Sequence, residues 1–422
     1  MKIVIIGAGF GGLRLARKLR NKKGIEITLI DRLNYHQFQP LFYQVATSGL
    51  NGSDIAFPLR KVFHNSTNIK FRMATVQEIL FSQNKVLTNI GPIAYDQLVI
   101  ATGAGTNFFG NKNMEQHALP MKSTIEAMEL RNRILKNFET AVSISDEQER
   151  KRLMSIVVVG GGPTGVELAG AIADMRRFVL HKDFPELNFA DMKIYLLEGS
   201  PKILGAMSAK SSEQSEAYLK KLGVIVKTNT LIDDYDGKQA RMKDGSVIDS
   251  ATVIWAAGIK GNIPAGIEPT LIARGNRILV DGQCRISSLN NVYAIGDVAL
   301  MQSDPAYPNG HPQVAPVATQ MADLLVKHFL LLQKQQPSVK QFSYYDKGAM
   351  ATIGRNLAVV DIPKPKLHFG GFFAWLVWMF LHLMLILGVK NRFFVFLNWM
   401  YAYLTRDQNL RLILDHHQGK AK

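Results

Sequence analysis

The sequence predicts an α/β fold of two glycine-loop domains, the second inserted in the first, followed by a C-terminal membrane-associating region. Three observations predict it. A β-branched run followed by three glycines and a helical pattern occurs at residues 2–16 and again, 153 residues later, at residues 155–169. Further apolar runs of strand length follow each copy, as in a parallel sheet buried on both faces. Residues 369–389 contain no Lys, Arg, Asp or Glu and are long enough to cross a bilayer.

Composition supports a well-packed protein of two or three units. The chain has 422 residues, 47% of them hydrophobic and 20% charged, which excludes a disordered chain. Its formal charge of +16 favours an anionic partner such as nucleic acid, a phosphate-rich cofactor or an acidic membrane surface. The single cysteine, Cys284, excludes disulfides within one chain, cysteine-based metal sites and dithiol redox chemistry. Electron transfer would therefore need a bound organic cofactor, and no metal site is predicted.

The first copy, KIVIIGAGFGGLRLA, has the order strand, glycine turn, helix. Gly7, Gly9 and Gly12 occupy the G-x-G-x-x-G positions, which permit a tight turn, close approach of the backbone to a pyrophosphate and tight helix packing. A second apolar strand ends at Asp31, 19 residues after Gly12, where an acid can bond a ribose. These features predict a Rossmann-like dinucleotide-binding domain. Residues 1–6 lack the segments of a signal peptide, so we expect the bulk of the chain in the cytoplasm.

The second copy, SIVVVGGGPTGVELA, repeats the order with Gly160, Gly162 and Gly165. Its acid, Glu198, comes 33 residues after the third glycine, and an insertion around residues 181–189 explains the longer spacing. One such motif is weak evidence, because an ordinary glycine turn can produce it. Two copies, each with strand, helix and acid, predict two bound dinucleotides.

Two other strands end in small residues, YDQLVIATGAG at 95–105 and TVIWAAGIKG at 252–261. Both have the character of crossovers between domains. We expect their Thr102, Gly103 and Gly258 to contact a cofactor.

The run VYAIGD places Gly296 and Asp297 directly after a further strand. The carboxylate can meet the sugar or ribityl chain of a cofactor, or cap a helix, or do both. The first domain is therefore expected to be discontinuous. The predicted boundaries are 1–120 and 265–332 for the first domain, 121–264 for the second and 333–422 for the C-terminal region.

Several segments together resemble type II NADH:quinone oxidoreductases, the single-chain respiratory dehydrogenases that pump no protons. Besides the glycine loops, the segments are NYHQFQPLFYQVAT (34–47), LVIATGA, GGGPTGVELAG, AIGD, DKGAMATIGR (346–355) and the tail GFFAWLVWMFLHL. The glycine loops belong to a broad flavoprotein superfamily, whereas segments 34–47 and 346–355 are much more specific. The resemblance covers nearly the whole chain.

The resemblance implies FAD on the first domain, NADH as substrate on the second and a membrane quinone as acceptor. Carried over by motif, the FAD contacts are Gly7, Gly9 and Gly12 on the pyrophosphate, Asp31 on the adenosine ribose, Asp297 on the ribityl chain, Gln39 and Pro40 beside the isoalloxazine, and Lys347. The NADH contacts are Gly160, Gly162, Gly165 and Glu198. A carboxylate at Glu198 accepts bonds from a 2′-hydroxyl but repels a 2′-phosphate, so NADH is preferred over NADPH, although nearby Lys202 could soften the preference.

Glu167 follows Gly165 by two residues, in the first turn of the second glycine-loop helix. A carboxylate there is stabilised by the helix N-terminus by about 0.3 to 1 kcal/mol. The resemblance implies a second role, in which Glu167 helps to couple protons to quinone reduction. The two accounts are compatible.

One departure concerns the quinone side. The family often has A-Q-x-x-x-Q, whereas residues 315–320 read APVATQ, with Pro316 at the first glutamine position. Only Gln320 carries over. Proline offers no side-chain hydrogen bond, so a quinone carbonyl must use Gln320, backbone or water.

The apolar tail could span a bilayer, fold as a buried hairpin or lie at the interface. A second aromatic stretch, FFVFLNWMYAYL at 393–404, is too short to span, and the Trp and Tyr side chains suit a headgroup boundary. Residues 364–422 contain eight Lys or Arg and two acids, which suits anionic lipid. We therefore prefer monotopic attachment at the cytoplasmic face of the inner membrane.

The sequence leaves other functions open. A sulfide:quinone oxidoreductase needs a cysteine pair that the chain lacks. A flavin-containing membrane redox sensor, or another pyridine-nucleotide-dependent flavoprotein reductase, remains the alternative. Nucleic-acid binding is disfavoured, because the basic residues are spread out and no nucleic-acid motif occurs. The sequence leaves the quinone type and the oligomeric state open, a homodimer included.

Overall fold

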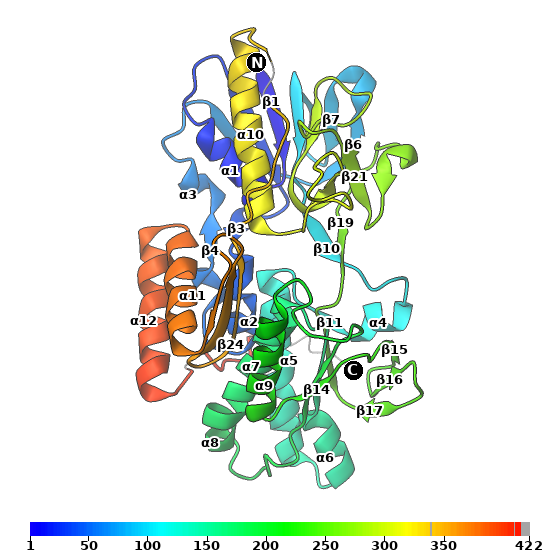
Figure 1. Ribbon diagram of the computed structural model, residues 1–422, viewed down its shortest axis with the longest axis vertical. Coiled ribbons are helices and arrows are strands. Elements are labelled where there is room, and N and C mark those ends of the chain that lie inside the picture. Colours follow the sequence, from blue (N-terminus) through cyan, green and yellow to red (C-terminus); the bar gives the residue numbers. More distant parts are fainter. Residues whose placement is uncertain (338–339, 409, 415–422) are drawn as a thin grey trace, which may run out of the picture. The chain divides into compact units, whose positions relative to one another are not determined.

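A computed structural model describes residues 1–337, 340–408 and 410–414, and confirms the mixed α/β fold (Figure 1). The chain forms two compact units, each assembled from three segments. The first unit comprises Met1–Gln37, Phe57–Gly105 and Ile259–Asp346. The second comprises Phe38–Ala56, Thr106–Gly258 and Lys347–Lys422, of which the described part is meant throughout.

These units differ from the predicted boundaries in several places, and the two longest differences are these. The C-terminal region is part of the second unit from Lys347 onward, and so is the early segment Phe38–Ala56. The reason is packing that sequence order does not reveal: helix α2 (Phe42–Ala46) contacts α5 (Thr124–Ser143) and α7 (Pro163–Met175), and strand β24 (Ala349–Gly354) contacts α7.

The first unit is built on a parallel sheet with the strand order β22-β9-β1-β2-β5. Its strands are β1 (Lys2–Ile6), β2 (Glu26–Asp31), β5 (Ile69–Met73), β9 (Gln97–Ile100) and β22 (Val292–Ala294). The β-branched residues of β1 are buried from Ile3 to Ile6, as a strand covered on both faces requires. Helices α1 (Phe10–Lys18) and α10 (Ala315–Gln333) pack on each other beside this sheet.

Smaller sheets complete the first unit. They are β6 (Val76–Leu80), β7 (Lys85–Thr88) and β8 (Gly91–Ala94); β20 (Ile272–Ala273), β21 (Arg277–Val280) and β23 (Ala299–Met301); and the crossover pair β10 (Ala104–Thr106) and β19 (Ile259–Gly261). The sequence placed both crossover segments at the ends of buried strands, and β10 and β19 are the continuations of those segments.

The second unit repeats the first sheet's arrangement, with the order β11-β18-β12-β13-β14 and all pairs parallel. Its strands are β11 (Leu119–Pro120), β12 (Ile156–Val159), β13 (Ile194–Leu197), β14 (Ile225–Lys227) and β18 (Thr252–Trp255). Strand β12 precedes the second glycine loop as β1 precedes the first, and the acid-bearing strand β13 lies beside it as β2 lies beside β1. An antiparallel sheet of β15 (Ile232–Tyr235), β16 (Gln239–Met242) and β17 (Val247–Asp249) completes this part.

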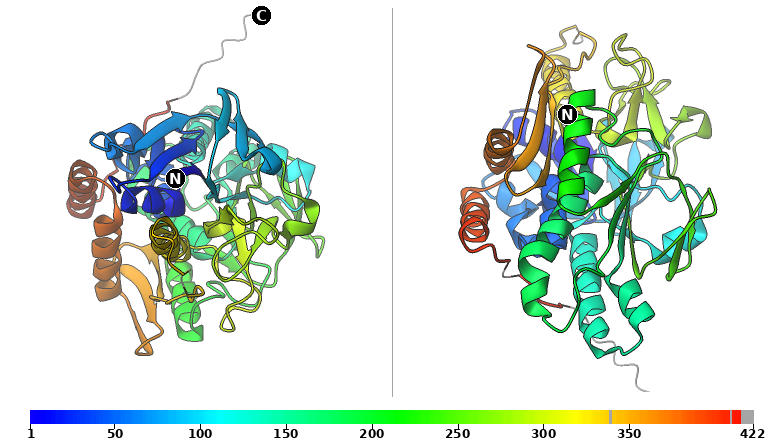
Figure 2. Two further views of the ribbon diagram at one scale, coloured as in Figure 1. Left: turned by 90° about the horizontal axis from the view of Figure 1, so that it is seen from above. Right: turned by 60° about the horizontal axis from the view of Figure 1, so that its bottom comes forward.

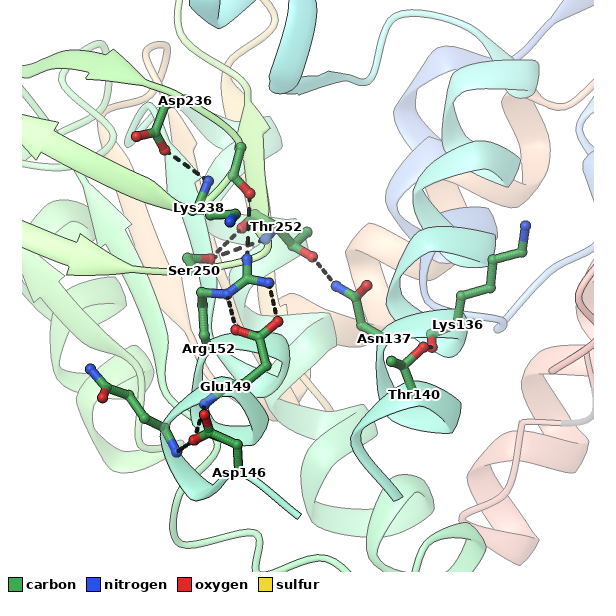
Figure 3. Close-up of polar contacts among 12 residues, drawn as sticks. Lys136, Asn137, Thr140, Asp146, Glu149, Arg152, Asp236, Lys238, Ser250 and Thr252 are labelled. Carbon is green, nitrogen blue, oxygen red and sulfur yellow. Dashed lines mark hydrogen bonds and ion pairs between the residues drawn. The ribbon is translucent and has the colours of Figure 1, made fainter. Parts of the chain in front are cut away.

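Helices α5 and α6 (Glu147–Met154) lead from β11 into the second sheet. Ten residues of α5 are buried, because its apolar positions recur at helical spacing and pack inward. Polar contacts hold both helices to the second sheet (Figure 3). Arg152 of α6 bonds Glu149 and the carbonyl of Gly237, and Asn137 of α5 donates to Thr252 of β18 (2.8 Å).

The C-terminal region adds strands β24, β25 (Leu357–Ile362) and β26 (Leu367–Gly370), then helices α11 (Phe372–Leu385) and α12 (Val389–Thr405). Figures 1 and 2 show these strands beside the two helices, in orange to red. Hydrogen bonds hold helix α12 against segment Phe38–Ala56. The Asn391 side chain donates to three backbone carbonyls of that segment, and the Trp399 indole donates to the Gln44 side chain (2.7 Å). Within the described ranges, neither of these helices nor any other has the length and apolar character to cross a bilayer.

Candidate active site

The first glycine loop accepts only glycine at two of its three motif positions. Gly7 has a φ of +102°, and a Cβ there would lie 2.3 Å from the carbonyl oxygen of Ala101. A Cβ on Gly12 would lie 1.9 Å from the Gly7 carbonyl oxygen. No atom lies within 4 Å of the Cβ position at Gly9, which is the N-cap of α1. The loop therefore leaves open space at a helix N-terminus, the geometry that receives a phosphate.

Asp31, at the end of β2, is fastened to this loop. Its Oδ2 accepts a hydrogen bond from the Ala8 N–H (2.6 Å), and its Oδ1 accepts one from the Leu33 N–H (2.8 Å). Burial raises the pKa of Asp31, and the two backbone bonds act in the opposite direction. The carboxylate is thus oriented at the loop, as its spacing from Gly12 predicted.

His36 is a residue of this site that the sequence analysis did not single out. Its Nδ1 lies 2.9 Å from the Ala8 carbonyl oxygen, which can only accept, so Nδ1 carries the proton. Burial lowers the pKa of His36, which keeps the ring neutral, and the ring packs edge-on against Phe10. Its position in the NYHQFQPL segment was the available signal. His36 and Asp31 therefore bond both backbone polar groups of Ala8: His36 bonds its carbonyl oxygen, and Asp31 bonds its N–H.

The other predicted FAD contacts of the first unit border the same loop. A Cβ on Gly11 would lie 3.2 Å from Ile295, which places the Gly296–Asp297 turn next to the loop. Gly296 has a φ of +75°, and Asp297 follows it in a short 3₁₀ turn.

Thr102 and Gly103 are linked to the returning strand. The Thr102 hydroxyl donates to the carbonyl oxygen of Asn262, and the Asn262 N–H donates to Gly103. Gly103 has a φ of +67°, a conformation that glycine adopts without strain. The returning segment at Asn262, where the sequence predicted a crossover between domains, is therefore hydrogen-bonded to the residues that follow the carboxyl end of β9.

The second glycine loop reproduces the first. Gly160 has a φ of +109°, and its Cβ position lies 2.7 Å from the Ala256 carbonyl oxygen. The Cβ position of Gly165 lies 1.9 Å from the Gly160 carbonyl oxygen, and that of Gly162 is open. Glu198 accepts from the Gly161 N–H (2.6 Å) and the Ser200 N–H (2.7 Å), as Asp31 does in the first unit.

Gly258, at the end of β18, has a φ of +90°. A Cβ there would lie 2.6 Å from the ring of Phe109, and the Gly258 carbonyl accepts from the Asn107 N–H. A larger residue at this position would displace the Phe109 side chain.

Glu167 lies in the second unit, on the buried face of α7. It is 9% exposed, and its Oε1 is 3.4 Å from the Thr352 N–H of β24. Burial raises the pKa of Glu167 to about 8, while the Thr352 N–H and the Trp378 indole act in the opposite direction. Its carboxyl therefore holds a proton at neutral pH and can donate it.

Gln320 and Pro316 lie on α10 of the first unit. Pro316 is the second residue of that helix, where a backbone N–H has no intrahelical partner, so proline fits there without strain. Both ends of the Gln320 side-chain amide bond the backbone of Tyr345. Its Nε2 donates to the Tyr345 carbonyl (2.9 Å), and its Oε1 accepts from the Tyr345 N–H (3.0 Å).

Gln39, Pro40 and Lys347 belong to the second unit. Gln39 and Pro40 form a single 3₁₀ turn with Leu41, and both are partly exposed. Lys347 is exposed and precedes β24. Among the residues that the structure describes, no group of three or more His, Cys, Asp or Glu side chains could hold a metal ion.

Sequence reasoning also missed Tyr43, Asp174 and Trp378, which share a cavity with Glu167. Asp174 lies seven residues after Glu167, so helical periodicity could have found it. Tyr43 and Trp378 come from distant segments, and one sequence gave no signal that they meet this helix.

Comparison with known proteins fits both the loops and the tail. A family model described as pyridine nucleotide-disulphide oxidoreductase matches residues 1–322, and one described as NDH2 C-terminal domain matches residues 346–407. The type II NADH:quinone oxidoreductase Ndh of Mycobacterium tuberculosis is 36% identical over 98% of this chain and 90% of its own length. The chain belongs to the type II NADH:quinone oxidoreductase family. NdhA of the same organism is 35% identical over 96% of this chain and 87% of its own length.

Membership of this family makes the protein an oxidoreductase and favours this activity over a redox sensor. A solved structure of NDH2 from Plasmodium falciparum in complex with NADH covers 98% of this chain and 99% of its own, with a TM-score of 0.88 and 22% identity. That likeness shows that the two proteins share a fold.

Proposed function

We propose that this type II NADH:quinone oxidoreductase oxidises NADH and reduces a membrane quinone through bound FAD, without pumping protons. The observation that carries the proposal is the matched pair of nucleotide cradles, one in each unit. Each has a glycine loop open at a helix N-terminus and a carboxylate fastened to that loop.

The first cradle fits FAD. Gly7, Gly9 and Gly12 leave room for a pyrophosphate, Asp31 can accept from the adenosine ribose, and the Asp297 turn lies next to the loop. The bound flavin would accept a hydride from NADH and give up two electrons. The resemblance adds Gln39, Pro40 and Lys347 from the second unit as further FAD contacts.

The second cradle fits NADH. Gly160, Gly162 and Gly165 would hold the pyrophosphate, and Glu198 would accept bonds from the adenosine ribose. Both Glu198 oxygens already accept a backbone N–H, which fixes the orientation of the carboxylate. A fixed negative charge repels a 2′-phosphate, so NADH is favoured over NADPH.

Gln320 is the proposed quinone contact. Among the described residues, its amide bonds the Tyr345 backbone, so a quinone carbonyl would replace the Tyr345 carbonyl as the acceptor of Nε2. Pro316 offers no such group, and this chain would therefore bind quinone with one side-chain amide fewer than relatives with two glutamines.

Membrane attachment is proposed through α11 and α12, at the cytoplasmic face. The two helices expose many large apolar side chains, among them Phe372, Phe373, Phe380, Leu385, Val389, Phe393, Phe394, Phe396, Met400 and Leu404. A patch of this kind favours insertion into the headgroup boundary of a lipid surface. Lys390, Arg392 and Arg406 lie on or beside α12 and favour anionic lipid.

A sealed-vesicle assay tests the activity and the absence of pumping together. Purified protein is bound to the outside of vesicles that contain quinone and an internal pH dye, and NADH is then added. We expect one quinol for each NADH oxidised and no change in the internal pH. NADH oxidation that consumes only oxygen, or acidification or alkalinisation of the vesicle lumen, would contradict the proposal.

A further inference from the structure

A cavity of about 170 Å³ lies inside the second unit and reaches Glu167. Helices α2, α7, α11 and α12 and strand β24 contribute its walls. Its wall includes six aromatic side chains: Tyr43, Phe178, Trp375, Trp378, Trp399 and Tyr403. A cavity of this size has room for several water molecules, and the carboxyl groups on its wall give them partners.

The two carboxyl groups lie on the same face of α7. Glu167 and Asp174 are seven residues apart, so their Cα atoms are about 10.5 Å apart along the helix axis, or two turns. Ala171 lies between them and also lines the cavity, and its short side chain leaves the space between the carboxyls open. Glu167 is buried, whereas Asp174 is partly exposed, so Asp174 is the outer of the two groups.

Both carboxyl groups bind protons more tightly than usual. Burial raises the pKa of Glu167 to about 8. Burial also raises the pKa of Asp174 to about 6, against the Arg355 N–H (2.8 Å) and the charges of Arg177 and Arg355. At neutral pH, Glu167 is therefore protonated, while Asp174 is mostly ionised and able to capture a proton.

The other titratable groups facing this cavity keep one charge state near neutral pH. Burial and the nearby carboxylates raise the pKa of Tyr43 well above its usual value, so its phenol stays neutral. Behind the cavity wall, His382 stacks on Trp378, and burial lowers its pKa to about 4, so it is also neutral.

The charged groups at the outer end are held by neighbours. The Arg355 guanidinium lies 4.2 Å from the ring centre of Tyr403, and that of Arg406 lies 5.7 Å from the ring centre of Phe178. Asp407 is paired with Arg411, which lowers its pKa. Among the described groups on this wall, Glu167 and Asp174 are the ones that change charge between pH 5 and 9.

The proposed reaction consumes one proton from water in each turnover. NADH, one proton and quinone give NAD⁺ and quinol: the hydride carries two electrons and one hydrogen nucleus, and the second hydrogen of the quinol comes from solvent. We propose that Asp174 captures this solvent proton and passes it through water in the cavity to Glu167. Each transfer leaves Asp174 ionised again, ready for the next proton. The inference rests on the proposed quinone reduction, and Asp174 acts in it through Glu167.

Asp174→Asn tests the relay. The amide oxygen still accepts from the Arg355 N–H, so the fold is kept while the proton-binding group is lost. Turnover is measured at pH 6 and pH 8, near the two pKa values, with quinone and with ferricyanide, which accepts electrons but no protons. We expect quinone turnover to fall about tenfold at pH 8 and little at pH 6, because solvent protons become scarce as pH rises. Ferricyanide turnover should be retained.

Three further variants separate the relay from a structural effect. Asp174→Glu keeps a carboxyl and should restore turnover at pH 8. Ala171→Leu fills the space between the carboxyls and should reproduce the pH-dependent loss with Asp174 in place. Glu186→Gln removes an exposed carboxyl outside the cavity and should change nothing. In infrared spectra of the holoenzyme, a protonated-carboxyl band titrating near pH 6 should be present in the wild type and absent from Asp174→Asn.

The outcomes are distinct. Wild-type quinone turnover in Asp174→Asn and Ala171→Leu at pH 8 would overturn the relay. So would a proportional loss with ferricyanide, which would mean a structural role for Asp174. Failure of the proposed function has a different signature: the wild type itself would be reduced by NADH yet would not reduce quinone at either pH.

Discussion

The two glycine-loop helices begin alike and then differ at equivalent positions. In both loops the first glycine has a positive φ, and the third glycine lies against the carbonyl oxygen of the first. In both, an acid accepts a hydrogen bond from the backbone N–H of the residue that follows the first glycine. Two residues after the third glycine, however, the first helix has Arg14 and the second has Glu167. Arg14 is partly exposed and forms a bidentate pair with Asp323 on α10. Glu167 is buried against an amide and an indole.

We infer that the features common to both loops and the residue that differs have different roles. A paired, half-exposed arginine stabilises the packing of two helices and needs no further explanation. A buried carboxyl without a cation is unfavourable when ionised, so it persists as the protonated acid. Groups of this kind are concentrated at functional sites. We therefore propose that the shared features of the loops bind nucleotides, and that Glu167, which differs between the two helices, transfers protons.

The largest expected effects come from the third glycines. Gly12→Ala and Gly165→Ala each place a Cβ 1.9 Å from a carbonyl oxygen, which the loop cannot accommodate without moving. We expect a cost of about 4 kcal/mol or more at the affected cradle. Gly12→Ala should purify without flavin, whereas Gly165→Ala should keep the flavin and lose NADH binding. Flavin content and NADH titration distinguish them, and the same defect in both variants would erase the assigned roles.

Glu167→Gln is expected to change how stability depends on pH. The folded-state pKa of about 8 lies above the unfolded value of 4.5, so the folded protein binds the extra proton and loses stability as pH rises through this window. Between pH 6 and 8 the wild type should lose about 1.4 kcal/mol per pH unit that Glu167→Gln does not lose. Denaturant unfolding at three pH values measures this. Parallel curves for the two proteins would show that Glu167 is not a buried acid. Arg14, at the equivalent position, should give no such difference.

Glu198→Gln is expected to have a moderate effect on the second cradle only. It weakens the bonds to the Gly161 and Ser200 N–H groups and to a ribose, each charge-assisted bond being worth about 1.5 to 3 kcal/mol. The KM for NADH should rise, and the preference over NADPH should shrink, with kcat nearly unchanged. The matched variant Asp31→Asn should instead weaken flavin retention. An unchanged ratio of NADH to NADPH in Glu198→Gln would mean that another group selects the coenzyme.

The smallest effect is expected at Arg14. Arg14→Met removes the pair with Asp323 while keeping much of the apolar stem, and pairs this exposed contribute about 0.5 kcal/mol. Thermal unfolding and turnover should both stay close to wild type. A large loss of turnover would mean that the equivalent positions on the two helices share a catalytic role, against the comparison above.

The sequence predicted the cradles well because their determinants are local. Strand, glycine loop and acid are fixed by spacing along the chain, so Gly12, Asp31 and Glu198 could be named, and the structure bonds each acid to its glycine loop. For Pro316, the structure adds a local reason why proline fits, its place in the first turn of α10.

The rest depends on contacts between segments far apart in sequence. His36 reaches the first loop across a gap of 28 residues, and Tyr43 and Trp378 meet α7 from opposite ends of the chain. The grouping of residues from Lys347 onward with the second unit has the same origin. Periodicity reports which face of a helix is buried but does not identify its neighbours, so the cavity between Glu167 and Asp174 could not be predicted.

The central claim is that one chain holds a reducible flavin in the first cradle and its pyridine-nucleotide donor in the second. An anaerobic absorbance titration of the wild type and Gly165→Ala tests it most directly. The account predicts that both proteins are yellow, that NADH bleaches the wild type but not the variant, and that added quinone restores the wild-type colour. A wild-type protein that remains colourless when incubated with FAD, or a variant that NADH bleaches equally well, would contradict it.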